Sequence, residues 1–217
     1  MISFLKLIRV KNLLIIAFTM YAMRLGVIYP MLEAFNKTIY NQPITIGSLP
    51  KEGTMEDLKN AGNFSFTVSN PHLLQLQMSE MEFFFLVLAV MMVAGGGYVI
   101  NDYFDIKIDS VNKPERQIVG KTIKRRSAML WHQILTWAGT VIGLFIAWRL
   151  ELVMLGITLA ILITAALWFY SADFKRKLFV GNLIVAVLAG FIPIIVGIGE
   201  ISLLQKRIFL NRILKNF

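Results

Sequence analysis

Cysteine is absent from the 217-residue chain, and charged residues and histidine are scarce. Without cysteine the protein cannot form disulfides, thiolate metal sites or a cysteine nucleophile. Charged residues make up 16% of the chain, against roughly 25% in ordinary soluble domains. Hydrophobic residues reach 57%, with 16 Phe and 4 Trp, which excludes a disordered chain. This composition is typical of one domain that is solvated mainly by lipid.

Five apolar stretches are long enough to cross a membrane, because a spanning helix needs about 20 apolar residues. They are residues 13–31, 83–100, 128–148, 152–170 and 180–198. The first follows a basic start but is too long for a signal peptide, and no small-residue cleavage site follows it. The pattern therefore predicts an all-α, polytopic bundle of transmembrane helices.

A long polar segment, 33–79, separates the first two spans and is rich in Asn, Gly and Pro. A loop of this length is unusual inside a compact domain, so we expect it to lie outside the membrane. The last residues, 201–217, are basic. The predicted organisation is one membrane domain, 1–200, that contains the loop 33–79, followed by a basic tail, 201–217.

The distribution of positive charge predicts the topology. The loop 107–126 contains seven Lys and Arg residues, whereas 33–79 contains three Lys and four acids. The positive-inside rule then places the N-terminus, the loop 107–126 and the loop 175–177 in the cytoplasm. This predicts a multi-pass protein of the inner cell membrane, with a tail, 201–217, that violates the rule. Arg24 is expected near the opposite membrane face, with its charged end extended to the surface.

An amide and three carboxylates, Asn101, Asp102, Asp105 and Asp109, follow the second span. If the helix continues past Ile100, Asn101, Asp105 and Asp109 lie within an arc of about 80°, with Asp102 beside them. Like charges at this spacing repel one another, so the face favours a bound cation. Carboxylate oxygens suit Mg²⁺, which waters and substrate phosphates complete.

An alternative interpretation is that these acids are simply the solvated end of a membrane helix. Against it, the acids alternate with apolar residues and precede a loop that holds Arg116. Arginine is well suited to grip a phosphate. We therefore favour a diphosphate site at the membrane surface.

Two further features of the spans are predicted to be structural. The glycines 95–97 could let another helix approach closely, or could simply be small-residue packing, which is the interpretation that we favour. His132 and Trp137 lie on the third span without candidate co-ligands. We expect core or interface roles for both.

The segment NDYFDIKIDSVNKPER, residues 101–116, resembles the first aspartate-rich motif of the UbiA superfamily of intramembrane prenyltransferases. The positions that fall on the pattern are Asn101, Asp102, Asp105, Asp109, Asn112, Pro114 and Arg116. Gln117 stands where many members have a second proline. Arg9 and Asn12 resemble the Arg-x-x-Asn that opens the first helix of the family.

A second signature lies between the fourth and fifth spans. Tyr170, Lys175 and the pair Gly181 and Asn182 resemble the Tyr, Lys and Gly-Asn signature of the same family. The CDP-alcohol phosphotransferases also place aspartates at a membrane helix end. Their pattern requires Asp-Gly and Ala-Arg between the aspartates, and neither occurs within 102–109.

The resemblance implies a magnesium-dependent transfer of a prenyl group from an isoprenoid diphosphate, such as geranylgeranyl diphosphate. It implies metal ligation and catalysis by Asp102, Asp105 and Asp109, with Asn101 as a further metal ligand. The substrate-binding residues that it implies are Asn12, Arg116, Lys121, Tyr170 and Lys175. For Lys175 an alternative role is topological charge, shared with Arg176 and Lys177.

The acceptor is predicted from the run NKPERQIVGKTIKRR, residues 112–126. It is most similar to the branch that acts on geranylgeranylglycerol phosphate, a lipid-type acceptor. Two alternatives remain: an enzyme for an aromatic quinone precursor of the menaquinone or ubiquinone type, and a non-catalytic membrane protein that binds isoprenoid diphosphate. The expected partners are the donor, the acceptor and membrane lipids, and not nucleic acid.

The sequence departs from the family after the fifth span. Members of the UbiA superfamily have about nine helices and a second aspartate-rich motif after the sixth. In this sequence the only acidic residue after Asp173 is Glu200. We therefore expect a chain truncated or frame-shifted after its fifth helix. Its activity is expected to be impaired unless a complementing chain or a second copy completes the site.

Overall fold

The computed structural model describes residues 2–40, 44–45, 65–66, 75–112 and 114–214, without the side chains of 2, 38–40, 44–45, 65–66, 116, 178 and 203–214. Most of the predicted loop 33–79 therefore lies outside the described residues. Two short strands within it, β1 (Ile44–Thr45) and β2 (Ser65–Phe66), pair antiparallel.

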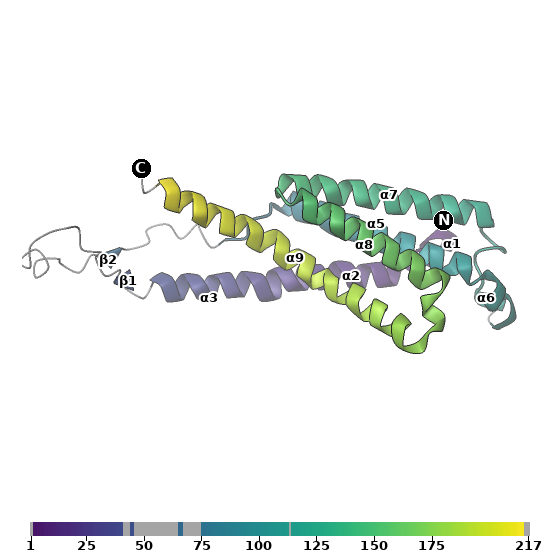
Figure 1. Cartoon of the computed structure of the whole chain (residues 1–217). Coiled ribbons are helices and arrows are strands. Elements are labelled where there is room, and N and C mark those ends of the chain that lie inside the picture. The colour runs from purple at the N-terminus through teal and green to yellow at the C-terminus, as the bar shows by residue number, and fades with distance from the viewer. Residues whose placement is uncertain (1, 41–43, 46–64, 67–74, 113, 215–217) are drawn as a thin grey trace, which may run out of the picture.

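Helices account for nearly all of the described structure (Figure 1). A short helix, α1 (Ile2–Leu7), precedes a rod made of α2 (Val10–Met23), a π-helical turn η1 (Arg24–Ile28) and α3 (Tyr29–Tyr40). The other long helices are α5 (Glu80–Phe104), α7 (Arg125–Arg149), α8 (Val153–Ala172) and α9 (Leu178–Leu214). Short elements connect them at the ends: α6 (Ile106–Asn112), η3 (Pro114–Arg116) and η4 (Phe174–Arg176).

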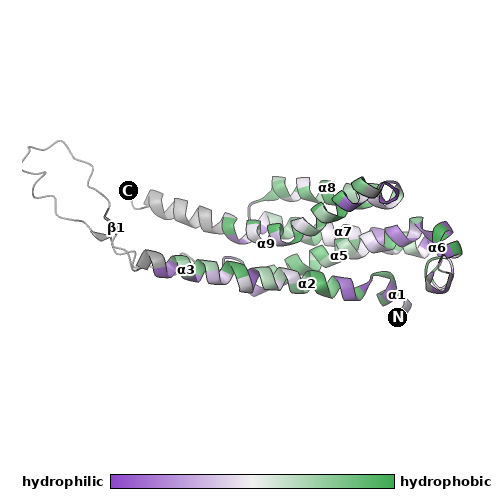
Figure 2. Ribbon diagram, turned by 90° about the horizontal axis from the view of Figure 1, so that it is seen from below, coloured by the Kyte–Doolittle hydropathy of each residue, from purple (hydrophilic) through white to green (hydrophobic). Residues whose placement is uncertain are grey.

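Five helical segments are long and apolar enough to cross a membrane, as Figure 2 shows by hydropathy. They are Val10–Lys37, Glu80–Phe104, Arg125–Arg149, Val153–Ala172 and Phe179–Ser202. The prediction of an all-α membrane bundle is confirmed. The helices extend beyond the predicted apolar stretches because their polar ends are helical too. α3 includes residues 33–40 of the predicted loop, and α9 runs without interruption across position 200.

Helix α5 lies at the centre of the bundle because its glycines let three other helices approach. Gly95 faces Leu13 of α2, Gly96 faces Thr136 of α7, and Gly97 faces Leu167 of α8. A Cβ added to Gly97 would lie 2.9 Å from a methyl group of Leu167. At these glycines the close approach of other helices and small-residue packing therefore describe the same contacts.

The two polar residues of the third span differ in their surroundings. His132 is buried, and its Nδ1 lies 3.0 Å from the carbonyl oxygen of Gly96. Trp137 is exposed on the bundle surface and donates its indole N–H to Gln133. A core role for His132 is confirmed, and Trp137 faces the surroundings of the bundle.

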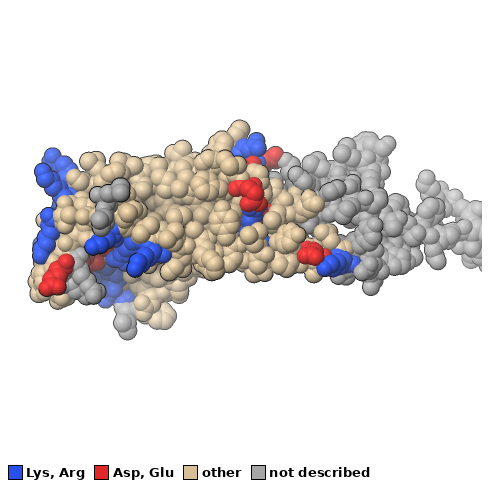
Figure 3. All heavy atoms as spheres, turned by 180° about the vertical axis from the view of Figure 1, so that it is seen from behind, with Lys and Arg blue, Asp and Glu red and all other residues tan. Residues whose placement is uncertain are grey.

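Lysine and arginine gather at one end of the molecule, around the N-terminus and α6 (Figure 3). The elements that meet at this end are α1, α6, the start of α7 and η4 (Figure 1). We call it the basic end. The three segments that the charge distribution assigns to one side of a membrane therefore lie at the same end of the bundle.

Arg24 lies at the end of the bundle opposite the aspartate motif, as expected, because it pairs with Glu80 at the start of α5. The expectation that its charged end extends to the surface is wrong. Its side chain is 1% exposed and does not reach the surface. Nε donates to Glu200 at 2.9 Å, and Nη1 donates to Glu80 at 2.9 Å. The buried carboxylate of Glu200 and the exposed carboxylate of Glu80, from two other helices, pair with the guanidinium, so it has no need to extend to the interface.

Candidate functional site

The aspartate motif occupies the junction between α5 and α6 at the basic end. α5 begins with a capping box formed by Ser79 and Glu82, and its helix continues past Ile100 to Phe104, as expected. Asp105 caps the helix, and the chain resumes as α6, in which the backbone N–H of Asp109 donates to the Asp105 carbonyl at 2.8 Å. The carboxylates of the motif therefore lie on successive turns.

Two carboxylates of the motif form ion pairs with cations from other elements. Arg9 Nη2 lies 2.8 Å from Asp102 Oδ1, and Lys175 Nζ lies 2.6 Å from Asp105 Oδ1. Lys175 also donates to Asn101 Oδ1 at 3.5 Å. Asp102, Asp105 and Lys175 are all less than one fifth exposed. These contacts join the start of α2, the end of α5 and η4 in one site.

Arg9 is a site residue to which no role was predicted. It has left-handed backbone angles, φ 52° and ψ 54°, at the break between α1 and α2. Its guanidinium lies over the ring of Tyr98 at 5.1 Å while it pairs with Asp102. A non-glycine residue held in this region is conformationally costly, and such residues concentrate at functional sites. The Arg-x-x-Asn pattern was the feature of the sequence from which a role for Arg9 could have been predicted.

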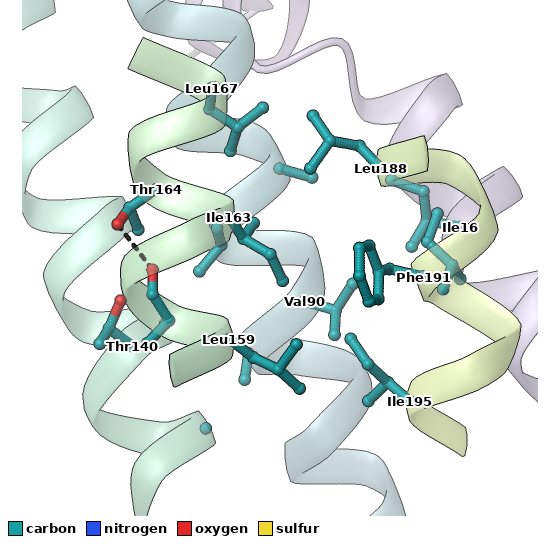
Figure 4. Close-up of a pocket in the computed structure, with 18 of the residues that line it drawn as sticks. Ile16, Val90, Thr140, Leu159, Ile163, Thr164, Leu167, Leu188, Phe191 and Ile195 are labelled. Atoms are coloured by element: carbon teal, nitrogen blue, oxygen red, sulfur yellow. Dashed lines mark hydrogen bonds between the residues drawn. The ribbon is translucent and has the colours of Figure 1, made fainter. Parts of the chain in front are cut away.

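An apolar cavity of about 750 Å³ opens beside these ion pairs and runs between α2, α5, α7, α8 and α9. Most of its polar lining lies at the basic end and comprises Arg9, Asn12, Tyr98, Asn101, Tyr170 and Ser171, and the hydroxyl residues Thr19, Thr140 and Thr164 line it farther in. The remaining wall is almost entirely aliphatic. Figure 4 shows Leu159 and Ile163 of α8 facing Leu188 and Ile195 of α9 across it.

The predicted residues therefore divide into three groups. Asn12, Asn101 and Tyr170 line the cavity, and Asp102, Asp105 and Lys175 pair beside its mouth. Lys121 is exposed and donates to the Pro114 carbonyl at 2.8 Å, within its own loop. Asp109 forms no ion pair with another described side chain. The side chain of Arg116 lies outside the described residues.

The carboxylates do not by themselves complete a metal site in this conformation. Within the described part of the chain, no three acidic or histidine side chains gather around one point. Mg²⁺ commonly takes only one or two protein carboxylates and draws its other ligands from water and substrate phosphates. The donor chemistry of Asp102, Asp105 and Asn101 fits such an ion.

Comparison with protein families identifies the chain. The model of the UbiA prenyltransferase family matches residues 69–199, which is more than half of the chain. The chain belongs to the UbiA prenyltransferase family. The match covers α5 to α8 and α9 as far as Gly199, and hence the aspartate motif, Tyr170 and Lys175, and confirms the resemblance.

Similar proteins of this family include two from archaea. The digeranylgeranylglyceryl phosphate synthase of Thermococcus kodakarensis is 35% identical over 118 residues, which cover 54% of this chain and 40% of that protein. The protein of the same name from Methanococcus maripaludis strain C5 is 37% identical over 117 residues, which cover 52% of this chain and 38% of that one. The chain spans about 40% of the length of these curated relatives.

A solved structure from work on digeranylgeranylglyceryl phosphate synthase in membranes has the same arrangement of helices. Its TM-score is 0.58 at 25% identity, and the match covers 91% of this chain and 52% of that one. The fold of this chain is therefore that of a UbiA-type helix bundle over about half the length of the solved protein.

Proposed function

We propose that this chain carries the donor site of a membrane prenyltransferase. The supporting observation is the position of Asp102 and Asp105, paired with Arg9 and Lys175, at the mouth of an apolar cavity inside a membrane bundle. An isoprenoid diphosphate has the matching chemistry, because it joins an anionic head to a long apolar tail. The head would lie at the basic end and the tail between α8 and α9.

Mg²⁺ is the cofactor that we propose, held by Asp102 and Asp105 with Asn101, and with Asp109 from the next turn. When bound, the ion neutralises charge on the departing diphosphate. We propose that Arg9 and Lys175, which pair with Asp102 and Asp105, donate hydrogen bonds to phosphate oxygens as that charge develops. We propose the same role for Arg116 and Lys121 of the loop that follows α6.

The cavity supplies the other half of the chemistry. Its aliphatic wall excludes water from the allylic carbon as the bond between that carbon and the diphosphate oxygen breaks. The acceptor oxygen then bonds to the carbon and loses its proton. Asn12 and Tyr170, which line the mouth, are proposed to orient the reacting groups.

Geranylgeranylglycerol phosphate is the acceptor that we propose, because the similar proteins are named digeranylgeranylglyceryl phosphate synthases. We also propose that the basic end faces the cytoplasm and that the protein lies in the inner cell membrane, since the positive charge gathers at this end (Figure 3). We also propose that full activity requires a complementing chain or a second copy of this chain, which completes the site.

The test is an assay of membranes that contain the chain, incubated with labelled geranylgeranyl diphosphate, Mg²⁺ and one acceptor at a time. We expect a product in which the labelled geranylgeranyl group is bonded to geranylgeranylglycerol phosphate, with diphosphate released, at a low rate unless a complementing chain or a second copy completes the site. That product should be lost in Asp105→Asn. Asp173→Asn is the matched control, because Asp173 is exposed and pairs only with the neighbouring Lys177 among the described ion pairs. If only an aromatic acceptor becomes labelled, the proposal of a lipid acceptor is overturned. If the chain binds the donor without transferring its prenyl group, the non-catalytic alternative is supported.

A further inference from the structure

The ammonium of Lys175 contacts two residues of the aspartate motif that are four positions apart. Its Nζ lies 2.6 Å from Asp105 Oδ1 and 3.5 Å from Asn101 Oδ1. Both oxygens belong to residues that the proposed function assigns to Mg²⁺. Lys175 therefore places its own positive charge between oxygens to which a bound cation would also be drawn.

Arg9 occupies the neighbouring carboxylate in the same way. Its Nη2 lies 2.8 Å from Asp102 Oδ1, and its guanidinium lies over the ring of Tyr98 at 5.1 Å. The charges of Arg9 and Lys175 together cancel those of Asp102 and Asp105. The motif thus carries two cations of the chain on the carboxylates that face the cavity mouth.

A divalent ion on the same oxygens would meet these cations at short range. Mg²⁺ lies about 2.1 Å from its oxygen ligands, so an ion on Asp105 Oδ1 would lie within about 5 Å of the Lys175 ammonium. Charges this close repel strongly where water is partly excluded. Asp102 and Asp105 are both less than one fifth exposed, so water screens the repulsion only in part.

The backbone that carries Lys175 is fixed by packing against α9. Lys175 belongs to the short turn η4, and Gly181 near the start of α9 lies against that turn. A Cβ added to Gly181 would lie 2.8 Å from the Phe174 carbonyl oxygen and 3.2 Å from Lys175 Cα. The ammonium therefore leaves Asp105 by rotation of its side chain, and not by a shift of η4.

We infer that Arg9 and Lys175 are internal counter-ions, which oppose binding of a free divalent cation and yield the carboxylates to a cation that arrives with a diphosphate. The inference rests on the proposed function, since it takes an isoprenoid diphosphate as the ligand. In this exchange the two side chains turn from the carboxylates to phosphate oxygens. The added positive charge is balanced because the diphosphate brings negative charge with it. Metal and donor therefore bind cooperatively, and each raises the affinity for the other by the same factor.

The experiment measures binding of Mn²⁺, which takes the same oxygen ligands as Mg²⁺, to the chain in phosphatidylcholine nanodiscs. Free Mn²⁺ is counted by its EPR signal, first without donor and then with geranylgeranyl diphosphate and no acceptor. Empty nanodiscs with the same donor give the metal that the donor binds by itself.

The variants Lys175→Met and Arg9→Met each remove one internal counter-ion. Lys177→Met is the matched control, because it removes the same charge two positions away, where Nζ pairs with the exposed Asp173 at 3.2 Å. Combining Lys175→Met with Asp105→Asn tests whether the metal binds at the motif.

Without donor, we expect weak binding of Mn²⁺ by the unaltered protein and at least about tenfold tighter binding by Lys175→Met and by Arg9→Met. Lys177→Met should bind Mn²⁺ as weakly as the unaltered protein, because its charge is farther away and better screened. Adding Asp105→Asn to Lys175→Met should abolish the gain. With donor, the unaltered protein should gain at least about tenfold in affinity for Mn²⁺, and Lys175→Met should gain less.

The outcomes separate this inference from the proposed function. If neither variant binds Mn²⁺ more tightly than Lys177→Met does, the inference is overturned, and the proposed function stands where the donor still promotes metal binding. A gain in one variant alone overturns the role of the other cation. Tighter binding in both variants with no effect of the donor on any protein overturns the proposed function and retains the counter-ions. No binding of Mn²⁺ by any protein, with or without donor, overturns both.

Discussion

Asp105 is a central residue of the proposed diphosphate site, because its carboxylate pairs with Lys175 beside the cavity mouth. Asp105→Asn keeps the shape of the side chain and removes its charge. Hydrogen bonds to charged groups are worth about 1.5–3 kcal/mol, so we expect magnesium-dependent binding of geranylgeranyl diphosphate to fall by about tenfold or more. Isothermal titration in nanodiscs checks this, with Asp173→Asn as the control. Unchanged affinity in Asp105→Asn would exclude a direct role for this carboxylate.

The buried pair of Arg24 and Glu200 makes a separate prediction about stability. Glu200→Gln leaves the guanidinium without its full counter-charge, and breaking one side of such a pair costs about 3–5 kcal/mol. We expect a lower midpoint of thermal unfolding in detergent for Glu200→Gln. The double variant Arg24→Met with Glu200→Met should recover most of the loss, because it removes both charges together. A single variant as stable as the unaltered protein would contradict the contacts described for Arg24.

Spacing in the sequence identified the aspartate motif because its members are close together along one helix. The same reasoning could not find the partner of Arg24, since Glu200 lies 176 positions away. Nothing local distinguishes a buried arginine from one that extends to the membrane surface. The ion pair between Arg9 and Asp102 was equally hidden, because it joins residues 93 positions apart.

Close packing of α5 against α7 is the main contact between elements, and Gly139 makes it possible. A Cβ at Gly139 would lie 2.8 Å from the Ala89 carbonyl oxygen of α5. Gly139→Leu should therefore destabilise the bundle by about 1–3 kcal/mol through overpacking. Thermal unfolding in detergent measures the loss. Gly190→Leu is the matched control on α9, where an added Cβ meets no protein atom within 4 Å, and equal effects of both substitutions would contradict this packing.

Hydropathy predicted every long helix, since a run of apolar residues in lipid has to be helical. It did not predict where the helices end. Residues 33–40 and the stretch after 200 mix apolar residues with polar and charged ones, yet they continue α3 and α9. Helix ends depend on caps and tertiary contacts, such as the capping box of Ser79 and Glu82, which an apolar window does not detect.

The orientation of the whole molecule in the membrane can be tested with single introduced cysteines, because the chain has no cysteine of its own. Single cysteines at Ser110 in α6 and at Glu33 in α3 would lie at opposite ends of the bundle (Figure 1). With the basic end in the cytoplasm, an impermeant maleimide added to intact spheroplasts should label Glu33→Cys only. Inverted vesicles should reverse the pattern. Labelling of Ser110→Cys in intact spheroplasts would refute the proposed orientation.

The central claim is that this membrane bundle binds an isoprenoid diphosphate at Asp102 and Asp105. Its most direct test is equilibrium binding of labelled geranylgeranyl diphosphate to the chain in nanodiscs, with Mg²⁺ or with EDTA. The account predicts saturable binding that requires Mg²⁺ and is lost when Asp102→Asn and Asp105→Asn are combined. Binding that is equally strong in EDTA and in the double variant would contradict it.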